Sequence, residues 1–509
     1  MEKALAISDF LARAELVYAD RIAIVDEPDQ PAVPLGSITY AEMADRARGL
    51  AAYLDDIGVP VGGRVAIVSH NAARMLIAFY GVCGSGRVLV PVNFRLATEE
   101  IEYIVGHSGS EVLLVDPDLR GLLEELGHPN GHVLGDDDDL LFPRGRTPRA
   151  WEADERATAT INYTSGTTAR PKGVQLSHRN NWINAVVFAM HLGLNDRDVL
   201  LHTLPIFHAN GWGMPFAATG LGIRHVILRK VDGFEILRRI EEHGITVMCG
   251  APAVISSILD AARAWDGPIP GRGLVRVVVA GAPPPTTVIE AVEAELGWEF
   301  IQIYGLTETS PLLTMNRSRS EWDHLEASER ARLLLRAGVP VVGTEMTTDA
   351  DGEVLARSNT VLTSYWENPT ATEDALGEGW FRTGDGGSID AGGYVTITDR
   401  LKDVIITGGE NVSSIEVEDA ILHHPHVTEV AVIGIPDDKW GELVTALVVT
   451  DGSEVTEESI TAMVREHIAG YKVPKRVEFR DELPRTATGK LQKAKLREPY
   501  WAGVERKIH

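Results

Sequence analysis

The chain has 509 residues, 44% of them hydrophobic and 24% charged, and its 48 basic and 73 acidic residues give a formal net charge of −25. This length exceeds what a single hydrophobic core supports, so at least two domains are expected, and the ordinary globular composition argues against disorder. The acidic balance opposes nonspecific binding to nucleic acid or to an anionic membrane surface, so a phosphate-bearing ligand requires local donors.

Residues 37–130 alternate between helix-like and strand-like segments. Thr39 and Glu42 stand at capping-box spacing at the start of one predicted helix, and residues 64–69 and 111–116 have the pattern of buried strands. This alternation predicts a parallel sheet with helices on its faces, whose ligands gather beyond the carboxyl ends of the strands. Further apolar runs of the same kind lie at 222–230, 245–252, 274–285 and 299–310.

The second half of the chain changes in character past residue 340. Short turn-rich segments predict a small β-rich part, and a compact α/β tail follows from about residue 403. The expected fold is therefore α/β, with a large N-terminal region of parallel sheets and helices, a small β-rich part, and a small mobile C-terminal domain. We place the domain boundary between residues 1–400 and 401–509. The acidic run at 135–139 is expected to form an exposed connector.

The stretch YTSGTTARPKG, at residues 163–173, combines hydroxyl side chains, glycines and basic residues. Hydroxyls and backbone amides of such a stretch can point at phosphate oxygens, and a lysine adds a positive charge, so a phosphate chain is the expected ligand. A Walker P-loop is excluded because Pro171 stands where that motif requires its second glycine. A polar surface loop is the alternative interpretation. The predicted phosphate-binding residues are Thr164, Ser165, Gly166, Thr167, Thr168 and Lys172.

This stretch resembles the signature loop of the adenylate-forming superfamily, which includes acyl-CoA synthetases, firefly-type luciferases and the adenylation domains of peptide synthetases. The resemblance covers nearly the whole chain, is closest to fatty-acyl-CoA synthetases, and implies ATP and CoA as substrates with Mg²⁺ as the metal. The other motifs of the superfamily follow in the usual order: GAPPP at 281–285, YGLTE at 304–308, TGD at 383–385, DRLKDVIITGGENVS at 399–413 and LPRTATGK at 483–490.

The resemblance implies a role for each motif residue at the nucleotide. Thr307 is placed at the α-phosphate, and Glu308 on Mg²⁺, an ion that prefers oxygen ligands. Asp385 is implied to accept hydrogen bonds from the ribose hydroxyls, with Arg400 beside it. Residues 163–173 then hold the β- and γ-phosphates, the part of ATP that leaves. The residues implied to face adenine are Gly281, Ala282, Pro283 and Tyr304.

The resemblance also places a catalytic lysine, Lys490, between the attacking carboxylate and the α-phosphate. A pivot between two poses of the C-terminal domain is implied at Lys402, because a hinge needs only a few residues to absorb a backbone change. Rotation about it would present Gly408, Gly409 and Glu410 to the thiol of CoA. Without the resemblance, a lysine in a tail loop is more often a solvated surface charge, and paired glycines form an exposed turn.

Residues 204–222 resemble the acyl segment of fatty-acyl-CoA synthetases, in which a histidine abuts the carboxylate and a tryptophan gates an apolar tunnel. His208 and Trp212 occupy these places, and Gly305 is implied to let the acyl group approach. The acid is therefore expected to be apolar, either a medium- or long-chain fatty acid or an aryl-alkyl acid. Alternatively, the histidine and tryptophan are packing partners on a helix. Residues 343–366 form a shorter stretch than is usual in the superfamily.

The predicted function is that of an acyl-CoA synthetase, an acid–thiol ligase that forms acyl-AMP, releases pyrophosphate and transfers the acyl group to CoA. Its partners are then a small carboxylic acid, ATP and CoA, and no nucleic acid. Two alternatives stay open: a stand-alone adenylating enzyme that loads a carrier protein or another nucleophile, and a non-catalytic nucleotide-binding regulator. A homodimer is compatible with the sequence.

The two cysteines, Cys83 and Cys249, have no CxxC spacing, so neither a disulfide framework nor a cysteine-rich metal site is expected. A reducing cytoplasm suits this composition. Residues 1–20 lack the apolar core of a signal peptide, and the mostly apolar stretch at 182–194 is too short to span a bilayer. We therefore expect a cytoplasmic protein without a transmembrane segment.

Overall fold

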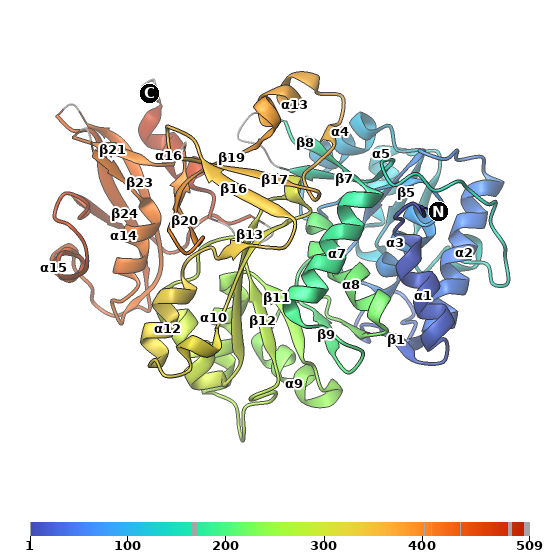
Figure 1. The fold of residues 1–509 in the computed structure, drawn as a ribbon, viewed down its shortest axis with the longest axis horizontal. Coiled ribbons are helices and arrows are strands. Elements are labelled where there is room, and N and C mark those ends of the chain that lie inside the picture. Colours follow the sequence, from blue (N-terminus) through green and yellow to red (C-terminus); the bar gives the residue numbers. More distant parts are fainter. Residues whose placement is uncertain are drawn as a thin grey trace.

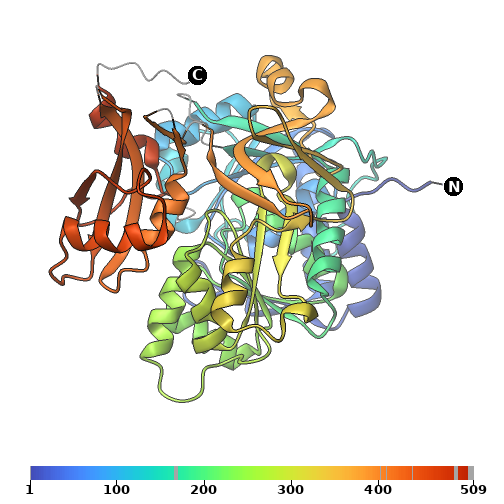
Figure 2. The ribbon, with the colours of Figure 1, turned by 60° about the vertical axis from the view of Figure 1, so that its left-hand side comes forward.

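Two large sheets with helices on their faces form the N-terminal region, and the elements beyond residue 403 form a separate lobe beside it (Figure 1, Figure 2). Within the described part of the chain, no helix combines the length and the apolar character needed to cross a bilayer. The computed structural model describes residues 2–164, 170–401, 403–408, 410–437, 439–486 and 491–502.

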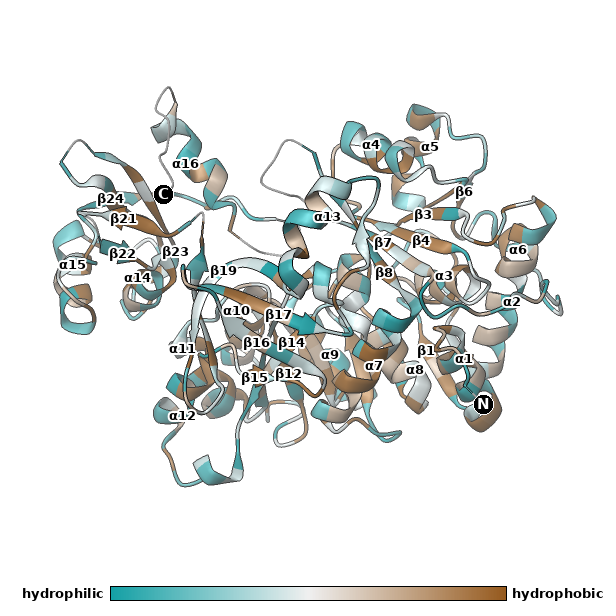
Figure 3. Cartoon of the chain, turned by 45° about the horizontal axis from the view of Figure 1, so that its top comes forward, coloured by the Kyte–Doolittle hydropathy of each residue, from teal (hydrophilic) through white to brown (hydrophobic). Residues whose placement is uncertain are grey.

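A seven-stranded sheet contains the strands on either side of the predicted phosphate loop. In sheet order its strands are β18 (Ser364–Tyr365), β8 (Lys172–Ser177), β7 (Thr158–Thr164), β4 (Val88–Val92), β3 (Arg64–Val68), β5 (Val112–Val115) and β6 (Gly131–Val133). The five strands from β7 to β6 pair in parallel, whereas β8 and β18 pair antiparallel at one edge. Hydrophobic residues run along β3 and β4 (Figure 3), as expected for parallel strands with both faces covered.

A nine-stranded sheet packs beside the first. In sheet order its strands are β15 (Val339–Pro340), β14 (Leu312–Arg317), β13 (Glu299–Gly305), β12 (Arg276–Val279), β11 (Val247–Gly250), β9 (Val199–His202), β10 (Arg224–Ile227), β1 (Ile22–Val25) and β2 (Ser37–Thr39). The six strands from β13 to β1 pair in parallel, and the edges are antiparallel. The four apolar runs predicted from the sequence form β10, β11, β12 and β13, so the predicted parallel α/β arrangement is confirmed.

Helices cover both sheets of the N-terminal region. The capping box predicted at Thr39 and Glu42 starts α2, with the Thr39 hydroxyl accepting from the Glu42 amide and the Glu42 carboxylate accepting from the Thr39 amide. The helices are α1 (Ser8–Tyr18), α2 (Tyr40–Asp56), α3 (Ala73–Cys83), α4 (Thr98–Ser108), α5 (Gly121–Leu126), α6 (Asp138–Leu141), α7 (His178–Leu192), α8 (Met214–Leu221), α9 (Gly233–His243), α10 (Pro252–Arg263), α11 (Thr286–Ala291), α12 (Ala327–Leu334) and α13 (Pro369–Ala375).

The β-rich part predicted past residue 340 is a four-stranded antiparallel sheet. Its strands, in sheet order, are β16 (Thr344–Thr348), β17 (Glu353–Ser358), β19 (Phe381–Ile389) and β20 (Val395–Arg400). The short segment 343–366 therefore supplies two of these strands and also β18, which joins the seven-stranded sheet.

The lobe beyond residue 403 has its own sheet and its own apolar core. The sheet consists of β22 (Glu410–Val412), β21 (Ile405–Thr407), β24 (Gly441–Thr450) and β23 (Val427–Asp437), and β25 (Arg476–Phe479) pairs parallel with β24. Its helices are α14 (Ser414–Ile421), α15 (Glu457–His467) and α16 (Lys493–Trp501). The main core cluster of this lobe draws its buried residues from 405–477, which gives the lobe a hydrophobic interior separate from those of the large sheets.

The prediction of an exposed connector at 135–139 is wrong for Asp138. This residue begins α6, and its carboxylate accepts hydrogen bonds from Nε of Arg74 at 2.9 and 2.8 Å and from the Gly135 amide. The side chain of Arg74 is only 3% exposed, and a buried guanidinium requires a carboxylate partner. The acidic run therefore contributes to the fold.

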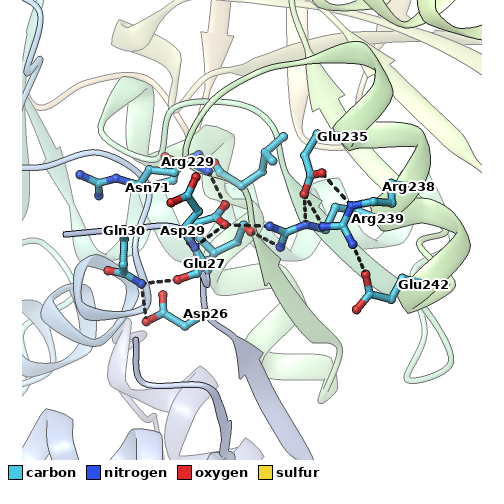
Figure 4. Close-up of polar contacts among 12 residues, drawn as sticks. Asp26, Glu27, Asp29, Gln30, Asn71, Arg229, Glu235, Arg238, Arg239 and Glu242 are labelled. Atoms are coloured by element: carbon cyan, nitrogen blue, oxygen red, sulfur yellow. Dashed lines mark hydrogen bonds and ion pairs between the residues drawn. The ribbon is translucent and has the colours of Figure 1, made fainter. Parts of the chain in front are cut away.

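Buried charges join the two sheets where their parallel strands end. Arg229, just after β10, donates to both carboxylate oxygens of Asp116, just after β5, at 2.8 and 2.6 Å. Glu27, just after β1, accepts from Arg239 on α9 at 2.8 Å and from the Arg229 amide at 3.2 Å (Figure 4). The pair Arg229–Asp116 therefore joins the two sheets, whereas the contacts of Glu27 lie within the nine-stranded sheet and its helices.

Candidate active site

Three of the predicted nucleotide residues meet at the end of β13. The Tyr304 hydroxyl donates a 2.7 Å hydrogen bond to Oδ2 of Asp385, and Nε of Arg400 lies 3.4 Å from Oδ1 of the same carboxylate. Asp385 on β19 and Arg400 on β20 are register partners, so the hairpin itself sets this contact. Burial, followed by the nearby Asp385 carboxylate, raises the pKa of Tyr304 well above its usual value, and the hydroxyl therefore stays a donor.

Asp385 of the TGD motif lies on β19. Its side chain is buried, and the carboxylate has roughly four lone-pair sites for donors. The Asp385 amide donates to the Thr383 hydroxyl at 3.1 Å, which fixes the backbone of the TGD motif. A ligand that presents two neighbouring hydroxyls suits this carboxylate, as the ribose assignment requires.

A second group of predicted residues forms around Tyr365. Its hydroxyl donates a 2.9 Å hydrogen bond to Oε1 of Glu308, and Nζ of Lys172 lies 5.1 Å from the centre of the Tyr365 ring. Thr164 and Lys172 are register partners of the β7–β8 hairpin, so they lie side by side. Thr307 begins the short turn Thr307–Thr309 that follows β13. Sequence reasoning missed Tyr365; it lies in β18, and no motif marks it.

Seven predicted site residues fall outside the described ranges. They belong to the phosphate loop, the pivot, the predicted CoA face and the catalytic position. They are Ser165, Gly166, Thr167, Thr168, Lys402, Gly409 and Lys490.

The surroundings of Glu308 fit a magnesium ion that is held mainly by phosphate oxygens. The carboxylate is half-buried, and Tyr365 orients it by hydrogen-bonding to one of its two oxygens. Among the described residues, no three His, Cys, Asp or Glu side chains gather into a metal site. Mg²⁺ commonly takes one or two carboxylates and completes its coordination with substrate phosphates and water. The Glu308 carboxylate can serve as one such protein ligand.

Gly305 is required by the packing of the backbone. A Cβ at this position would lie 1.6 Å from the carbonyl oxygen of Pro311, so no side chain fits there. The fold alone therefore requires glycine at position 305. The resemblance implies, in addition, that Gly305 admits the acyl group.

The predicted adenine wall follows the strand next to β13. Gly281 is exposed with φ of +96°, a left-handed value that suits glycine, and Ala282 and Pro283 lead towards α11. Ala280, directly before the wall, and Ile303, directly before Tyr304, belong to one apolar cluster. The wall and the tyrosine therefore extend from neighbouring strand ends.

The acyl segment contains a left-handed turn. Ala209, Asn210, Gly211 and Trp212 have φ of 44°, 54°, 56° and 60°. This backbone costs each non-glycine residue roughly 1–2 kcal/mol, so the surrounding structure must hold it in place. Half-buried His208 begins this segment. It is therefore not an α-helix on which a histidine and a tryptophan four residues apart pack as neighbours.

Trp212 is 4% exposed and belongs to the apolar cluster that contains Ala280, Ile303 and Leu312. The indole thus lies on the apolar side of the strand ends at which Tyr304 and the predicted adenine wall begin. The predicted acyl side is therefore linked through one apolar cluster to the residues that directly precede Tyr304 and the predicted adenine wall.

Sequence reasoning missed a set of buried asparagines around this turn. Asn210 is fully buried and bonds with Thr160, Asn162 and Asn181, while Asn184 donates to the carbonyl of Trp212 at 3.2 Å. The sequence signal that could have revealed them is the segment RNNWIN, which places asparagines in an otherwise apolar helix. Buried asparagine amides are found where they have hydrogen-bond partners, so such a segment predicts a polar network.

Gly408 and Glu410 lie on the β21–β22 hairpin of the C-terminal lobe, and both are exposed. The Gly408 amide donates to the carbonyl of Trp440 at 2.8 Å, and a Cβ at Gly408 would come within 3.0 Å of that indole. With φ of +62°, Gly408 adopts a turn that favours glycine.

Comparison with known proteins matches two family models to the chain. The model described as AMP-binding enzyme covers residues 11–366, and the model of the AMP-binding enzyme C-terminal domain covers residues 416–490. The chain belongs to the AMP-binding enzyme family. The resemblance to the adenylate-forming superfamily is thereby confirmed.

Similar proteins align along nearly their whole length. The 4-hydroxybutyrate–CoA ligase 2 of Metallosphaera sedula is 37% identical, with 96% of this chain and 93% of that protein covered. The 2-methylpropanoate–CoA ligase CCL4 of Humulus lupulus is 36% identical, with 96% and 94% covered. A solved structure of the anthranilate CoA ligase AuaEII with anthranoyl-AMP superposes with a TM-score of 0.88 at 27% identity, covering 99% of each chain. The predicted enzyme class, an acid–thiol ligase, and the predicted α/β fold are confirmed.

Proposed function

We propose that the protein is an acyl-CoA synthetase for an apolar monocarboxylic acid, which it activates as acyl-AMP before transfer to CoA. The observation that carries this proposal is the meeting of a polar and an apolar side at the ends of β12 and β13. Tyr304 and Asp385 form the polar side, and buried Trp212 lies in the cluster of Ala280 and Ile303 on the apolar side. The acyl-adenylate of an apolar acid likewise has a polar half, the AMP group, and an apolar half, the acyl group.

The first half-reaction joins the acid to AMP. A carboxylate oxygen attacks the α-phosphorus of ATP, the bond to the β-phosphate oxygen breaks, and pyrophosphate leaves. Such a step needs positioning and neutralisation of charge more than covalent help from the protein. Asp385 and Arg400 would hold the ribose, Lys172 would face the phosphates, and Lys490 is proposed to lie between the two reacting groups.

Glu308 is proposed to hold Mg²⁺, with Tyr365 fixing the direction of the carboxylate. When bound, the ion neutralises phosphate charge. Thr307 is proposed at the α-phosphate, and Gly281, Ala282 and Pro283 beside adenine.

The second half-reaction forms the thioester. The thiol sulfur of CoA attacks the acyl carbonyl carbon, and AMP leaves. We assign the CoA face to Gly408, Gly409 and Glu410, and the pivot to Lys402 between domains 1–400 and 401–509. Support comes from the exposed β21–β22 hairpin and from the core that the C-terminal lobe forms by itself.

The acid is proposed to be apolar because Trp212 and its neighbours are apolar. Similar proteins ligate 4-hydroxybutyrate and 2-methylpropanoate, and a structural neighbour binds anthranoyl-AMP. Trp212 is 4% exposed, so a medium- or long-chain acid requires this side chain to move, whereas a short acid does not. Short aliphatic, long aliphatic and aryl acids are therefore the three classes that the assay must separate.

The test is AMP release from ATP and Mg²⁺ across acids of graded length and aromaticity, with and without CoA. We expect CoA-dependent AMP release with an apolar acid and formation of the matching acyl-CoA. Pyrophosphate release that leaves CoA unused favours loading of a carrier protein. Absence of both pyrophosphate and AMP release with every acid would favour the regulator and overturn the proposal.

A further inference from the structure

The left-handed turn at 209–212 is held by buried amides. Oδ1 of Asn210 accepts a hydrogen bond from Nδ2 of Asn162 at 3.0 Å. Its Nδ2 donates to Oγ1 of Thr160 at 2.9 Å and to Oδ1 of Asn181 at 2.8 Å. The side chain amide of Asn210 is therefore bonded at its oxygen and at both of its N–H groups, although the residue is fully buried.

The partners of Asn210 come from two rigid elements. Thr160 and Asn162 are two positions apart on β7 and so lie on one face of that strand, where the Thr160 hydroxyl also donates to Oδ1 of Asn162 at 3.1 Å. Asn181 lies on the first turn of α7, where its Nδ2 donates to the carbonyl of Ser177 at 3.0 Å. The turn is thus anchored to a strand and to a helix.

A second anchor lies one helical turn along α7. Nδ2 of Asn184 donates to the carbonyl of Trp212 at 3.2 Å, and its Oδ1 accepts from the Leu312 amide at 3.2 Å. A Cβ at Gly213 would lie 2.3 Å from Nδ2 of Asn184, so the chain passes close to this amide. Asn181 and Asn184 are three residues apart and share one face of the helix.

The geometry points to Asn210, held by Thr160, Asn162 and Asn181, as a positioning residue that sets the acid-binding side of the active site. It does so by fixing the left-handed backbone between His208 and Trp212. This inference rests on the proposed function, in which those two residues face the acid. Because asparagine tolerates left-handed backbone, the residue type suits both the turn and the network.

The effect is expected to be selective for the acid. The turn carries His208 and Trp212, whereas Tyr304 and Asp385 on β13 and β19 are bonded to each other and need no contact with Asn210. Loss of the network therefore changes how the acid is held and leaves the nucleotide contacts in place.

The experiment measures KM for the acid and for ATP by pyrophosphate exchange, together with the thermal midpoint, in four variants. Thr160→Val removes the hydroxyl at nearly constant volume, and Thr160→Ser retains it. Asn210→Gly keeps left-handed backbone accessible and removes the amide. Asn316→Ala is the matched control, since Asn316 is equally buried on β14 but donates to Leu333 and Arg336 on another side of the sheet.

We expect Thr160→Val and Asn210→Gly to raise KM for the acid about tenfold or more while KM for ATP changes by less than about twofold. Thr160→Ser should stay near wild type, and Asn316→Ala should lower the thermal midpoint without raising KM for the acid. The inference would be overturned by equal KM values for the acid in Thr160→Val and Thr160→Ser. Equal increases in KM for the acid and in KM for ATP would also overturn it. A wild-type enzyme inactive with every acid would instead overturn the proposed function and, with it, this assignment.

Discussion

Asp419 on α14 of the C-terminal lobe accepts hydrogen bonds from both the amide and the hydroxyl of Thr286 at the start of α11. The amide contact is 2.9 Å, and the hydroxyl lies 2.8 Å from each carboxylate oxygen. Thr286 directly follows the GAPPP motif at 281–285, which contains the predicted adenine wall, so this contact ties the orientation of the lobe to the predicted nucleotide side.

Asp419→Ala should loosen the lobe from this orientation. A hydrogen bond to a carboxylate contributes about 1.5–3 kcal/mol, so its loss shifts the balance between orientations by roughly tenfold or more. Limited trypsin digestion of the segment 400–403 and small-angle scattering should report faster cleavage and a larger radius of gyration. Asp451→Ala is the control, because Asp451 pairs with His426 within the same lobe. Indistinguishable digestion of the two variants would contradict a role for the contact.

Asp385→Ala should raise KM for ATP about tenfold or more and leave KM for the acid nearly unchanged, because the carboxylate is assigned to the ribose. Tyr304→Phe should have a smaller effect, since it removes one donor to that carboxylate. Pyrophosphate exchange at varied ATP and acid checks both.

The raised pKa of Tyr304 adds a pH criterion. The hydroxyl stays protonated through the alkaline range in which an unperturbed tyrosine ionises, near pH 10. Any alkaline fall in kcat/KM below about pH 10 should therefore persist in Tyr304→Phe. Disappearance of that fall in the variant would show that Tyr304 titrates.

Lys490→Ala should lower acyl-adenylate formation by several orders of magnitude and spare thioester formation from supplied acyl-AMP. The lysine is assigned only to the first half-reaction, where it offsets charge on the carboxylate and the α-phosphate. Pyrophosphate exchange measures the first step, and release of AMP from acyl-AMP with CoA measures the second. An equal loss in both steps would contradict the assignment of Lys490 to the first half-reaction alone.

Glu235→Gln should lower stability at neutral pH by about 1 kcal/mol, a value discounted for the exposure of this site. Hydrogen bonds from Arg238 and then from Arg239 lower the pKa of Glu235 to about 2, against the opposing effect of burial (Figure 4). A carboxylate whose pKa is lower in the folded state stabilises the fold at pH values above its unfolded-state pKa, here near 4.5. This stabilisation is lost as the pH falls towards 2, the folded-state pKa.

Thermal midpoints of wild type and Glu235→Gln should therefore converge between pH 4.5 and 2. Glu241→Gln, at an exposed position of the same helix, serves as the control. A difference between the wild type and Glu235→Gln that stays constant across this range would contradict the assignment.

Local patterns in the sequence predicted much of the fold. The apolar runs that became β10 to β13 and the capping box at Thr39 depend only on neighbouring residues, and both were confirmed. The acidic run at 135–139 was misjudged because Asp138 is fixed by Arg74, a partner 64 residues away in the sequence. A distant partner leaves no trace in local composition.

The sequence by itself determined the class of protein: its motifs, in order, identified the superfamily and predicted the residues of the nucleotide side. Only the tertiary structure showed which contacts hold the predicted residues of the nucleotide and acyl sides. The bond from Tyr365 to Glu308, the contact from Thr286 to Asp419 and the amide network of Asn210 each join segments that are remote in the chain. The physical reason is that the residue types of a motif are set by the chemistry of the ligand. The side chains that position the motif residues depend instead on how sheets and helices pack.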